Sequence, residues 1–325
     1  MNILITGANG FLGRAIVSRL LNSGITVRAT DLGETSGASN ILYRKADITR
    51  PDDLKPLLEN VTTVIHAAGL AHIFSPDARS DAKFQQINEI GTVNMASAAS
   101  EADVKHFILI SSVSVYGPYT QRMCDENAPC NAVGAYALSK YNAELRAIEI
   151  ARESGMALTI LRLATLYGGG DPGNVGRLMR MLDRRRFLWI GDGSNRKSLL
   201  HIGDAARACI EVAERPASGI NIYNVSAPAC TMREIVDGIA YELEKQPISS
   251  VRIPASLALL LSRYLSKIPN RRTARLHQTV EKWLAEDVYD TRRFEKVYGF
   301  QTNISLKDGL KREAYWYRLS KKDDY

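Results

Sequence analysis

The feature that most constrains the fold is a glycine-rich turn between an apolar run and an amphipathic helix at the start of the chain. The run Ile3-Leu4-Ile5 is followed by Thr6-Gly7-Ala8-Asn9-Gly10-Phe11-Leu12-Gly13, and then by apolar residues at helical spacing. A strand, a glycine turn and a helix start in this order bring the backbone close to a pyrophosphate at the positive end of a helix. The turn therefore predicts a pyrophosphate-binding unit.

The following 160 residues alternate between strand-like and helix-like patterns. Strands are expected at 3–5, 26–30, 42–46, 61–68, 106–110 and 158–163, and helices at 51–58, 80–101 and 134–153. This alternation predicts an α/β fold with a doubly wound parallel sheet. A turn-rich loop follows Leu163, so we expect a Rossmann domain over 1–164 and a smaller, mainly helical substrate domain over 165–325. Residues 199–225 are expected to return to the first domain.

A hydroxyl, a phenol and an ammonium are expected at the carboxyl edge of this sheet. The strand predicted at 106–110 brings Ser112, two residues further on, to its C-terminal end. Tyr136 and Lys140 lie four residues apart on the helix predicted at 134–153. This spacing places Tyr136 and Lys140 on one helical face, where the ammonium is expected to lower the Tyr pKa. Such a base suits removal of a proton from a substrate alcohol whose carbon gives up a hydride.

Asp31 lies at the end of the second predicted strand, about 20 residues after the glycine turn. A carboxylate at this place hydrogen-bonds the adenosine ribose 2′-hydroxyl and repels a 2′-phosphate, which favours NAD over NADP. Two polar residues carry weaker signals. His66 is expected to be a packed core histidine, and Asn88 needs a hydrogen-bond partner, either in a link between strands or in a cofactor pocket.

Composition argues against a nucleic-acid-binding protein. The 325 residues carry a net charge of +7, and no nucleic-acid-binding motif accompanies the cationic clusters at 184–186 and 271–275. We expect these clusters to form a solvated face; contact with an anionic diphosphate is the next alternative, and contact with nucleic acid or membrane is the last. The four cysteines lack metal-ligand spacing. With a strand starting at Asn2 and no apolar run of about 18 residues, we expect a cytoplasmic protein. The apolar stretch 253–265 is expected to be a packed or lid helix, with a membrane-surface helix as the alternative.

These motifs resemble the extended short-chain dehydrogenase/reductases, in particular NAD-dependent nucleotide-sugar epimerases and dehydratases. The resemblance covers nearly the whole chain and includes TGANGFLG (6–13), HAAG (66–69), SSVSVYG (111–117) and YALSK (136–140). It implies that Tyr136 is the base, Ser112 its partner and Lys140 the ligand of the nicotinamide ribose. It also implies that NAD is contacted by Gly7, Gly10, Phe11, Leu12, Gly13, Asp31, Asp47, Ile48, Ala67 and Ala68. The implied substrate contacts are Ser112, Thr165, Asn174 and Lys197.

Departures from the family pattern narrow the reaction. The 4,6-dehydratases carry Asp and Glu after the catalytic hydroxyl, whereas this chain has Val113 and Ser114, so dehydration lacks its acid and base. The family often has Asn at the position of Thr165 and Arg at that of Lys197. The leading expectation is a 4-epimerase of a UDP-hexose or UDP-N-acetylhexosamine, with surface-polysaccharide precursor synthesis as its setting.

Other activities stay open at this stage. They are a 4-ketoreductase of a UDP-4-keto-6-deoxyhexose that uses NADH or NADPH, a non-catalytic NAD-binding sensor, and a reductase of steroid-like or phenolic carbonyl compounds. The resemblance also implies a homodimer that pairs the helices predicted at 80–101 and 134–153. It implies no metal site.

Overall fold

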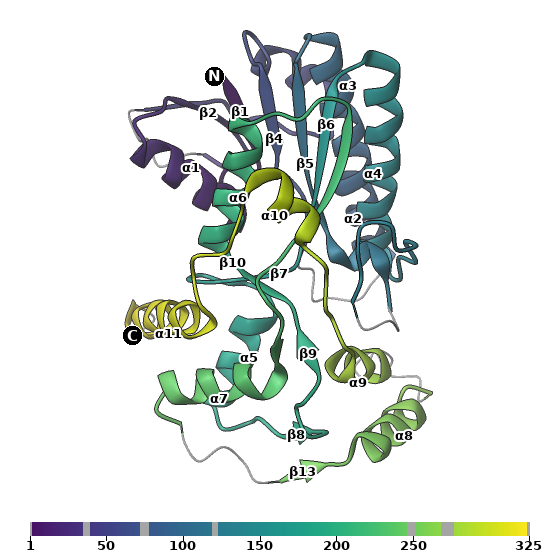
Figure 1. Cartoon of the computed structure of the whole chain (residues 1–325), viewed down its shortest axis with the longest axis vertical. Helices are drawn as coiled ribbons and strands as arrows, with labels where there is room; N and C mark the ends of the chain where they lie inside the picture. Colours follow the sequence, from purple (N-terminus) through teal and green to yellow (C-terminus); the bar gives the residue numbers. More distant parts are fainter. Residues whose placement is uncertain are drawn as a thin grey trace.

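A seven-stranded parallel sheet forms the upper lobe of the computed structural model, which describes residues 2–34, 40–71, 78–118, 123–245, 251–267 and 276–323 (Figure 1). The strand order is β11-β6-β5-β4-β1-β2-β3. The doubly wound parallel sheet is therefore confirmed. The strands are β1 (Ile3–Thr6), β2 (Val27–Thr30), β3 (Ile41–Tyr43), β4 (Thr63–His66), β5 (His106–Ser112), β6 (Ala157–Leu163) and β11 (Ile220–Val225).

The chain reverses its direction of winding between β1 and β4. From β1 it proceeds outward through β2 to β3, and it then returns to the other side of β1 as β4. Thr6 at the end of β1 pairs in register with His66 at the end of β4. In open α/β sheets ligands bind at the carboxyl ends of the strands where the order reverses, so this is the expected place for a cofactor.

Helices cover both faces of the sheet. On one face, α1 (Phe11–Asn22) and α6 (Ile202–Glu214) bury Ile16 and Ala205 against Ile5 of β1. On the other, α3 (Gly91–Glu101) and α4 (Ala135–Ser154) bury Met95 and Ala147 against Leu4. The strand alternation of β1 thus supplies both cores, because successive side chains point to opposite faces.

Three segments differ from the sequence expectation. The helix expected at 51–58 consists of two 3₁₀ turns, η1 (Pro51–Asp53) and η2 (Lys55–Leu57), because Pro56 lacks the N–H that an α-helix would need there. The helix expected at 80–101 consists of α2 (Ala78–Phe84), a π-helical segment η3 (Gln85–Ile90) and α3. The third strand ends at Tyr43 rather than at residue 46. The short 3₁₀ turn η4 (Val113–Tyr116) follows β5 directly.

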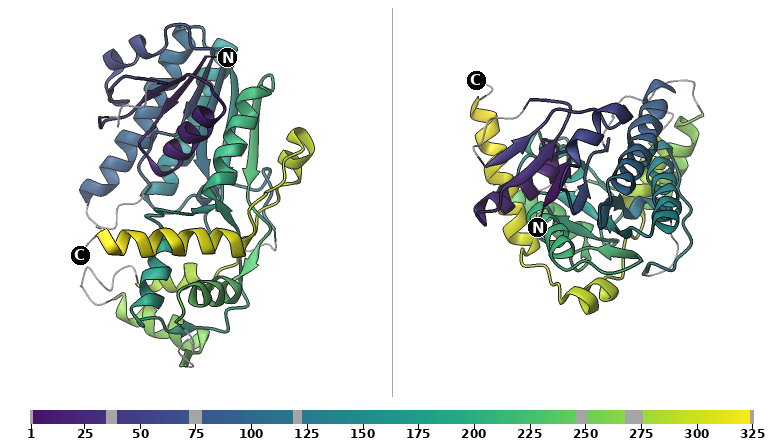
Figure 2. Two further views of the ribbon diagram at one scale, coloured as in Figure 1. Left: turned by 90° about the vertical axis from the view of Figure 1, so that its left-hand side faces the viewer. Right: turned by 90° about the horizontal axis from the view of Figure 1, so that it is seen from above.

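The lower lobe continues from the carboxyl edge of the sheet. Its third core packs α5 and α7 around Met179 and Ile239, and α11 lies across the junction between the two lobes (Figure 2). The remaining elements are β7 (Thr165–Tyr167), α5 (Asn174–Asp183), β8 (Trp189–Ile190), β9 (Arg196–Lys197), β10 (Leu199–His201), β12 (Cys230–Thr231), α7 (Met232–Glu242), β13 (Arg252–Ile253), α8 (Ala255–Leu265), α9 (Leu276–Leu284), α10 (Arg292–Tyr298) and α11 (Leu306–Asp323).

The division into residues 1–164 and 165–325 stays a prediction. Beyond that division, β11 is nevertheless the end strand of the sheet, in register with β6, and α6 packs beside α1. The chain thus crosses between the lobes more than once.

Candidate active site

The glycine turn after β1 lies against the chain that leaves β4. Gly7 has φ +69°, and a Cβ atom there would lie 2.6 Å from the backbone N of Ala68. A Cβ on Gly13 would lie 1.9 Å from the carbonyl oxygen of Gly7, so this glycine lets α1 approach the turn. Only glycine fits at these two positions, because any side chain would meet backbone.

The first turn of α1 is open to an anion. Gly10 is its N-cap residue, and among the described residues no side chain caps this helix or adds an acidic group to its first turn. The N–H of Gly10 donates to Gly7, 2.9 Å away, which closes the turn below Phe11 and Leu12. The N-terminal N–H groups and the helix dipole favour negative charge here, so the turn fits a pyrophosphate.

Asp31 ties the end of β2 to the glycine turn. Its Oδ2 atom accepts from the backbone N–H of Asn9 at 2.9 Å, and its Oδ1 atom accepts from that of Leu32 at 2.7 Å. The structure therefore brings this carboxylate to the pyrophosphate turn although 22 residues separate it from Asn9. A carboxylate fixed here fits an adenosine ribose and disfavours a 2′-phosphate.

The residues expected to contact the adenine and the middle of the cofactor are engaged in contacts within the protein. The Asp47 carboxylate accepts from the N–H and hydroxyl of Thr49, at 2.9 and 2.8 Å, and so closes its own loop. Ile48 is buried and packs so closely against Gly91 of α3 that a Cβ there would lie 2.6 Å from it. Ala67 and Ala68 directly follow β4, and the N–H of Ala68 donates to the Thr6 hydroxyl at 3.2 Å.

Ser112 is the last residue of β5 and the N-cap of η4. Its hydroxyl accepts from the N–H of Ser114 at 3.2 Å, which fixes its orientation at the strand end. Val113, the next residue, is buried, so its side chain supplies no acid or base at this edge.

Tyr136 and Lys140 both lie in the first half of α4, as expected. Tyr136 is half-buried with its ring edge against Phe84, at a centroid distance of 5.8 Å. The Lys140 ammonium is buried and donates to the carbonyl of Ile110 at 2.7 Å, which links α4 to β5. Burial lowers the pKa of Lys140 to about 8, against the opposing charge of Glu144.

The expectation that Lys140 lowers the pKa of Tyr136 is wrong for this structure. Burial raises the pKa of the Tyr136 phenol above 10.0, and a hydrogen bond with Ser112 opposes that shift only in part. The reason is that the Lys140 ammonium is directed to Ile110. Ser112 is the polar partner of the Tyr136 phenol, and its hydrogen bond acts against the effect of burial on that pKa.

Asn88 and Ser139 hold this region together, and sequence reasoning identified only the first as a polar residue in need of a partner. The Asn88 side chain accepts from the N–H of Leu70 at 2.7 Å and donates to its carbonyl and to the Ser139 hydroxyl, both at 3.0 Å. It thereby joins the loop after β4 to α4, one residue before Lys140. Asn88 lies in η3, and π-helical segments are frequent at functional sites.

A buried ion pair one helical turn beyond Lys140 was not predicted. Glu144 accepts from Arg162 of β6, whose Nη2 atom lies 2.6 Å from Oε2, and it also accepts from the hydroxyl of Ser111. The pair therefore fixes α4 to β5 and β6 beside Ser112. No local spacing indicates this pair, because its two residues lie 18 positions apart on different elements.

Three of the four expected substrate residues lie beyond the sheet strand β6, in the part of the chain that forms the lower lobe. Thr165 begins β7, which pairs with β10. Asn174 is the exposed first residue of α5, whose N-terminus is held by Asp171 through the N–H groups of Gly173 and Gly176.

Lys197, the remaining expected substrate residue, lies in β9. It is buried, and its ammonium donates to the Asp287 carboxylate at 2.6 Å and to the Lys282 carbonyl at 2.7 Å. Its side chain thus links β9 to the segment that follows α9. Contact with a diphosphate stays a prediction for Lys197.

His66 is a packed core histidine, as predicted. Its Nδ1 and Nε2 atoms lie 2.8 and 3.1 Å from the hydroxyls of Thr6 and Thr92, and burial lowers its pKa to about 3. Within the described part of the chain, no group of three or more His, Cys, Asp or Glu side chains could hold a metal ion. None of the described helices is long and apolar enough to cross a membrane.

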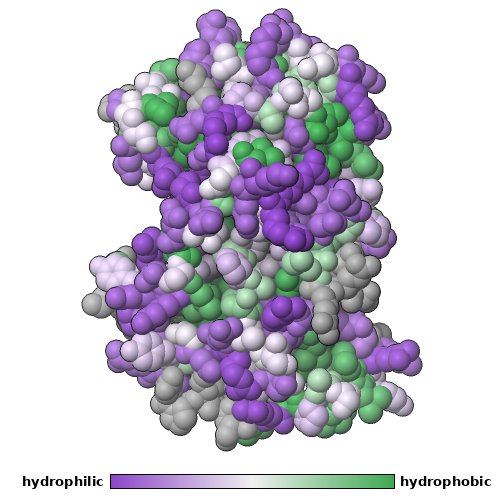
Figure 3. Space-filling view, in the orientation of Figure 1, coloured by the Kyte–Doolittle hydropathy of each residue, from purple (hydrophilic) through white to green (hydrophobic). Residues whose placement is uncertain are grey.

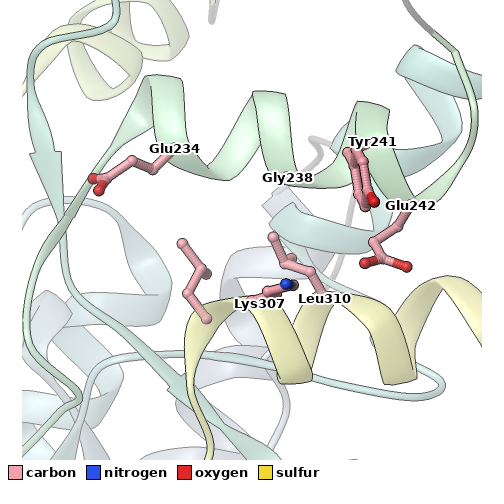
Figure 4. Close-up of a pocket in the computed structure, with 7 residues that line it drawn as sticks. Glu234, Gly238, Tyr241, Glu242, Lys307 and Leu310 are labelled. Carbon is pink, nitrogen blue, oxygen red and sulfur yellow. The ribbon is translucent and has the colours of Figure 1, made fainter.

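A hollow of about 320 Å³ between α7 and α11 lies apart from these residues (Figure 4). Glu234, one of its lining residues, accepts from the N–H and hydroxyl of Thr231 in a capping box and so stabilises the start of α7. Its wall is otherwise largely apolar, with Leu306 and Leu310 from α11. The hollow lies between two packed helices, and Glu242 and Lys307 also line it.

Comparison with known proteins agrees with this geometry. The chain is 28% identical over 324 residues to a UDP-glucose 4-epimerase of Vibrio cholerae, covering 96% of this chain and 94% of that protein. It is 29% identical over 337 residues to an N-acetyl-alpha-D-glucosaminyl-diphospho-ditrans,octacis-undecaprenol 4-epimerase of Escherichia coli O157:H7, covering 99% and 97%. It resembles the structure of MoeE5 in complex with UDP-glucuronic acid and NAD, with 25% identity, a TM-score of 0.79 and coverage of 98% and 100%.

The model of one protein family, described as the NAD dependent epimerase/dehydratase family, matches residues 3–226. This range contains the glycine turn, Asp31, Ser112, Tyr136 and Lys140, and the fit of the turn to a pyrophosphate agrees with NAD as the cofactor. The protein is therefore an NAD-dependent enzyme that belongs to the NAD-dependent epimerase/dehydratase family.

Proposed function

We propose that the enzyme is a 4-epimerase of a nucleotide-linked hexose, with a UDP-hexose or UDP-N-acetylhexosamine as substrate. The observation that carries the proposal is the group formed by Ser112, Tyr136 and Lys140 at the carboxyl edge of the sheet, beside the glycine turn. The Vibrio cholerae and Escherichia coli relatives support it, since both are named 4-epimerases of a sugar diphosphate.

In the proposed reaction, Tyr136 removes the proton of the C4 hydroxyl and later returns it to the 4-keto sugar. Ser112 donates a hydrogen bond to the C4 oxygen and keeps the phenol oriented. Bound NAD would supply the acceptor for the C4 hydride and the same hydride for its return. The 4-keto sugar must present its other face before the hydride returns, which produces the C4 epimer. Because the hydride returns, net epimerisation consumes no cofactor.

The proposed NAD ligands are the turn residues Gly7, Gly10, Phe11, Leu12 and Gly13 at the pyrophosphate and Asp31 at the adenosine ribose. Asp47 and Ile48 would meet the adenine, Ala67 and Ala68 the middle of the cofactor, and Lys140 the nicotinamide ribose. The Lys140 ammonium donates to the carbonyl of Ile110, and because an ammonium has three donors it could also donate to a ribose hydroxyl.

Elimination of water is not proposed, because η4 supplies no carboxyl group beside Ser112. Val113 is buried and Ser114 is the only polar side chain next to it in that turn. Thr165 and Asn174 are proposed to contact the nucleoside diphosphate from the lower lobe, at the starts of β7 and α5.

The test is proton NMR of UDP-glucose and of UDP-N-acetylglucosamine, each mixed with the purified enzyme without added cofactor. Appearance of the C4 epimer supports the proposal, and Tyr136→Phe is expected to lower the rate at least about a hundredfold, as loss of a general base does. Absence of any epimer after NAD is supplied contradicts it. Oxidation of NADH or NADPH with a UDP-4-keto-6-deoxyhexose would then support the 4-ketoreductase alternative.

A further inference from the structure

Helix α8 exposes its large apolar side chains and buries its small ones. Five large side chains recur at i, i+3, i+4, i+7 and i+8, so they share one face, and Leu260 and Tyr264 are 63% and 74% exposed. Ala258 and Ser262, on the neighbouring face of the helix, are 7% and 2% exposed. The expectation of a packed or lid helix stays a prediction, since α8 packs against α9 on one side and exposes this apolar face on another. The apolar face consists of Leu257, Leu260, Leu261, Tyr264 and Leu265.

The buried face of α8 is held by specific contacts. Ser262 donates to the carbonyl of Leu259, and its hydroxyl lies 3.0 Å from Nδ1 of His277 in α9. The side of α8 that meets α9 is therefore occupied by small residues, and the leucines point away from it. Figure 3 shows hydrophobic atoms gathered at the lower right of the molecule, where α8 lies in Figure 1.

The surroundings of the apolar face are cationic. Arg252, Arg263 and Lys267 are exposed, and the segment 251–267 contains no acidic residue. Among the described side chains none forms an ion pair with any of these three cations. A leucine-rich face flanked by unpaired cations complements an anionic lipid surface, where the apolar side chains enter the acyl boundary and the cations meet headgroup phosphates.

We propose that α8 docks the enzyme on the surface of a bilayer that contains anionic phospholipids. The three cations favour this surface over a second copy of the chain, since two copies would bring like charges together at the edge of the same apolar face. The helix has 11 residues, so it lies in the interface and the docking is reversible.

Docking on a bilayer would also affect which substrates the active site meets. This consequence rests on the proposed function, whereas the docking itself does not. An epimerase held at a bilayer meets sugar diphosphates carried on a polyprenol as well as soluble nucleotide sugars. The name of the Escherichia coli relative states a substrate of that lipid-linked kind. The two substrates share the glycosyl diphosphate that the lower lobe would contact.

The test is co-flotation of the full chain with vesicles of phosphatidylcholine alone and of phosphatidylcholine with phosphatidylglycerol. We expect binding to the anionic vesicles only. The double substitution Leu260→Ser/Leu261→Ser should weaken it at least about tenfold, because two apolar side chains no longer enter the acyl boundary. Arg263→Glu should weaken it more than fivefold, since each cation near an anionic surface is worth about fivefold.

The matched control is Leu319→Ser, which removes a leucine of similar exposure from α11. It should bind vesicles as the wild type does, and all variants should keep the wild-type circular dichroism spectrum and turnover of a soluble substrate. No flotation of the wild type, or equal flotation of Leu260→Ser/Leu261→Ser and wild type, overturns the proposal. A dimer in sedimentation that Leu260→Ser/Leu261→Ser dissociates also overturns it, because a second copy then covers the face.

These outcomes are separable from those of the epimerase proposal. Vesicle binding needs no turnover, so it can succeed with an enzyme that epimerises no UDP-sugar. Conversely, a soluble enzyme that epimerises UDP-N-acetylglucosamine but never floats retains the proposed function and loses this inference.

Discussion

Removal of the Glu144 carboxylate is expected to destabilise the enzyme strongly. Glu144 and Arg162 are 1% and 4% exposed at their side chains, with an Nη2–Oε2 distance of 2.6 Å. The substitution Glu144→Ala leaves a guanidinium buried without its counter-charge, which costs about 3–5 kcal/mol in comparable pairs. With an unfolding entropy of about 2.1 cal/mol/K per residue, a loss of ~4 kcal/mol lowers Tm of this chain by about 6 °C.

The chain offers a control on the same helix. Glu149 pairs with Arg146 at the same 2.6 Å, but both side chains are more than half exposed. Glu149→Ala should therefore cost at most about 0.5 kcal/mol, because water screens the pair. The double substitution Glu144→Met/Arg162→Met should recover most of the stability, since neither charge is then buried alone. Urea unfolding measures all three, and equal losses for Glu144→Ala and Glu149→Ala would refute the reasoning.

Three further predictions concern the cofactor site and the lower lobe. Gly13→Ala should weaken NAD binding at least about tenfold in calorimetry, because its Cβ would displace the Gly7 carbonyl and distort the turn; unchanged affinity would contradict the close approach of α1. Asp31→Ala should lower the preference for NAD over NADP, measured as the ratio of the two dissociation constants, since it removes the charge that repels a 2′-phosphate. Burial, and then the charge of Asp171, raise the pKa of Glu313 from 4.5 to about 8. Because the folded state keeps this proton longer than the unfolded state, wild-type stability falls by ~1.4 kcal/mol per pH unit between about 4.5 and 8. Glu313→Gln should remove that slope, and a parallel loss in both proteins would contradict the assigned pKa.

Local patterns predicted most of the sheet and the places of Ser112, Tyr136 and Lys140 at its edge. The turn between Ile5 and Phe11, and the i,i+4 pair of Tyr136 and Lys140, are encoded within a few residues, so sequence periodicity reveals them. The same is true of β5, whose apolar run ends in Ser112. The type of a helix was mispredicted where a single residue determines it. Pro56 lacks the N–H for an α-helix, so residues 51–57 form two 3₁₀ turns instead.

Partners that are distant in sequence could not be predicted. Nothing near Lys197 indicates Asp287, 90 residues away, and nothing near Glu144 indicates Arg162 on the neighbouring strand. The direction of the Lys140 ammonium, towards Ile110, depends on how α4 packs against β5, and so does the raised pKa of Tyr136. The outward face of α8 could not be recognised either, because apolar residues at helical spacing usually mark the buried side.

The central claim is that the C4 hydride leaves the sugar and returns to the same molecule while Tyr136 moves the proton. The most direct measurement uses UDP-N-acetylglucosamine or UDP-glucose deuterated at C4, with the product analysed by NMR and mass spectrometry in ordinary water. The account predicts that the epimer retains its deuterium at C4 and that Tyr136→Phe forms almost none of it. An epimer that has lost deuterium to solvent, or one formed at the wild-type rate by Tyr136→Phe, would contradict the account.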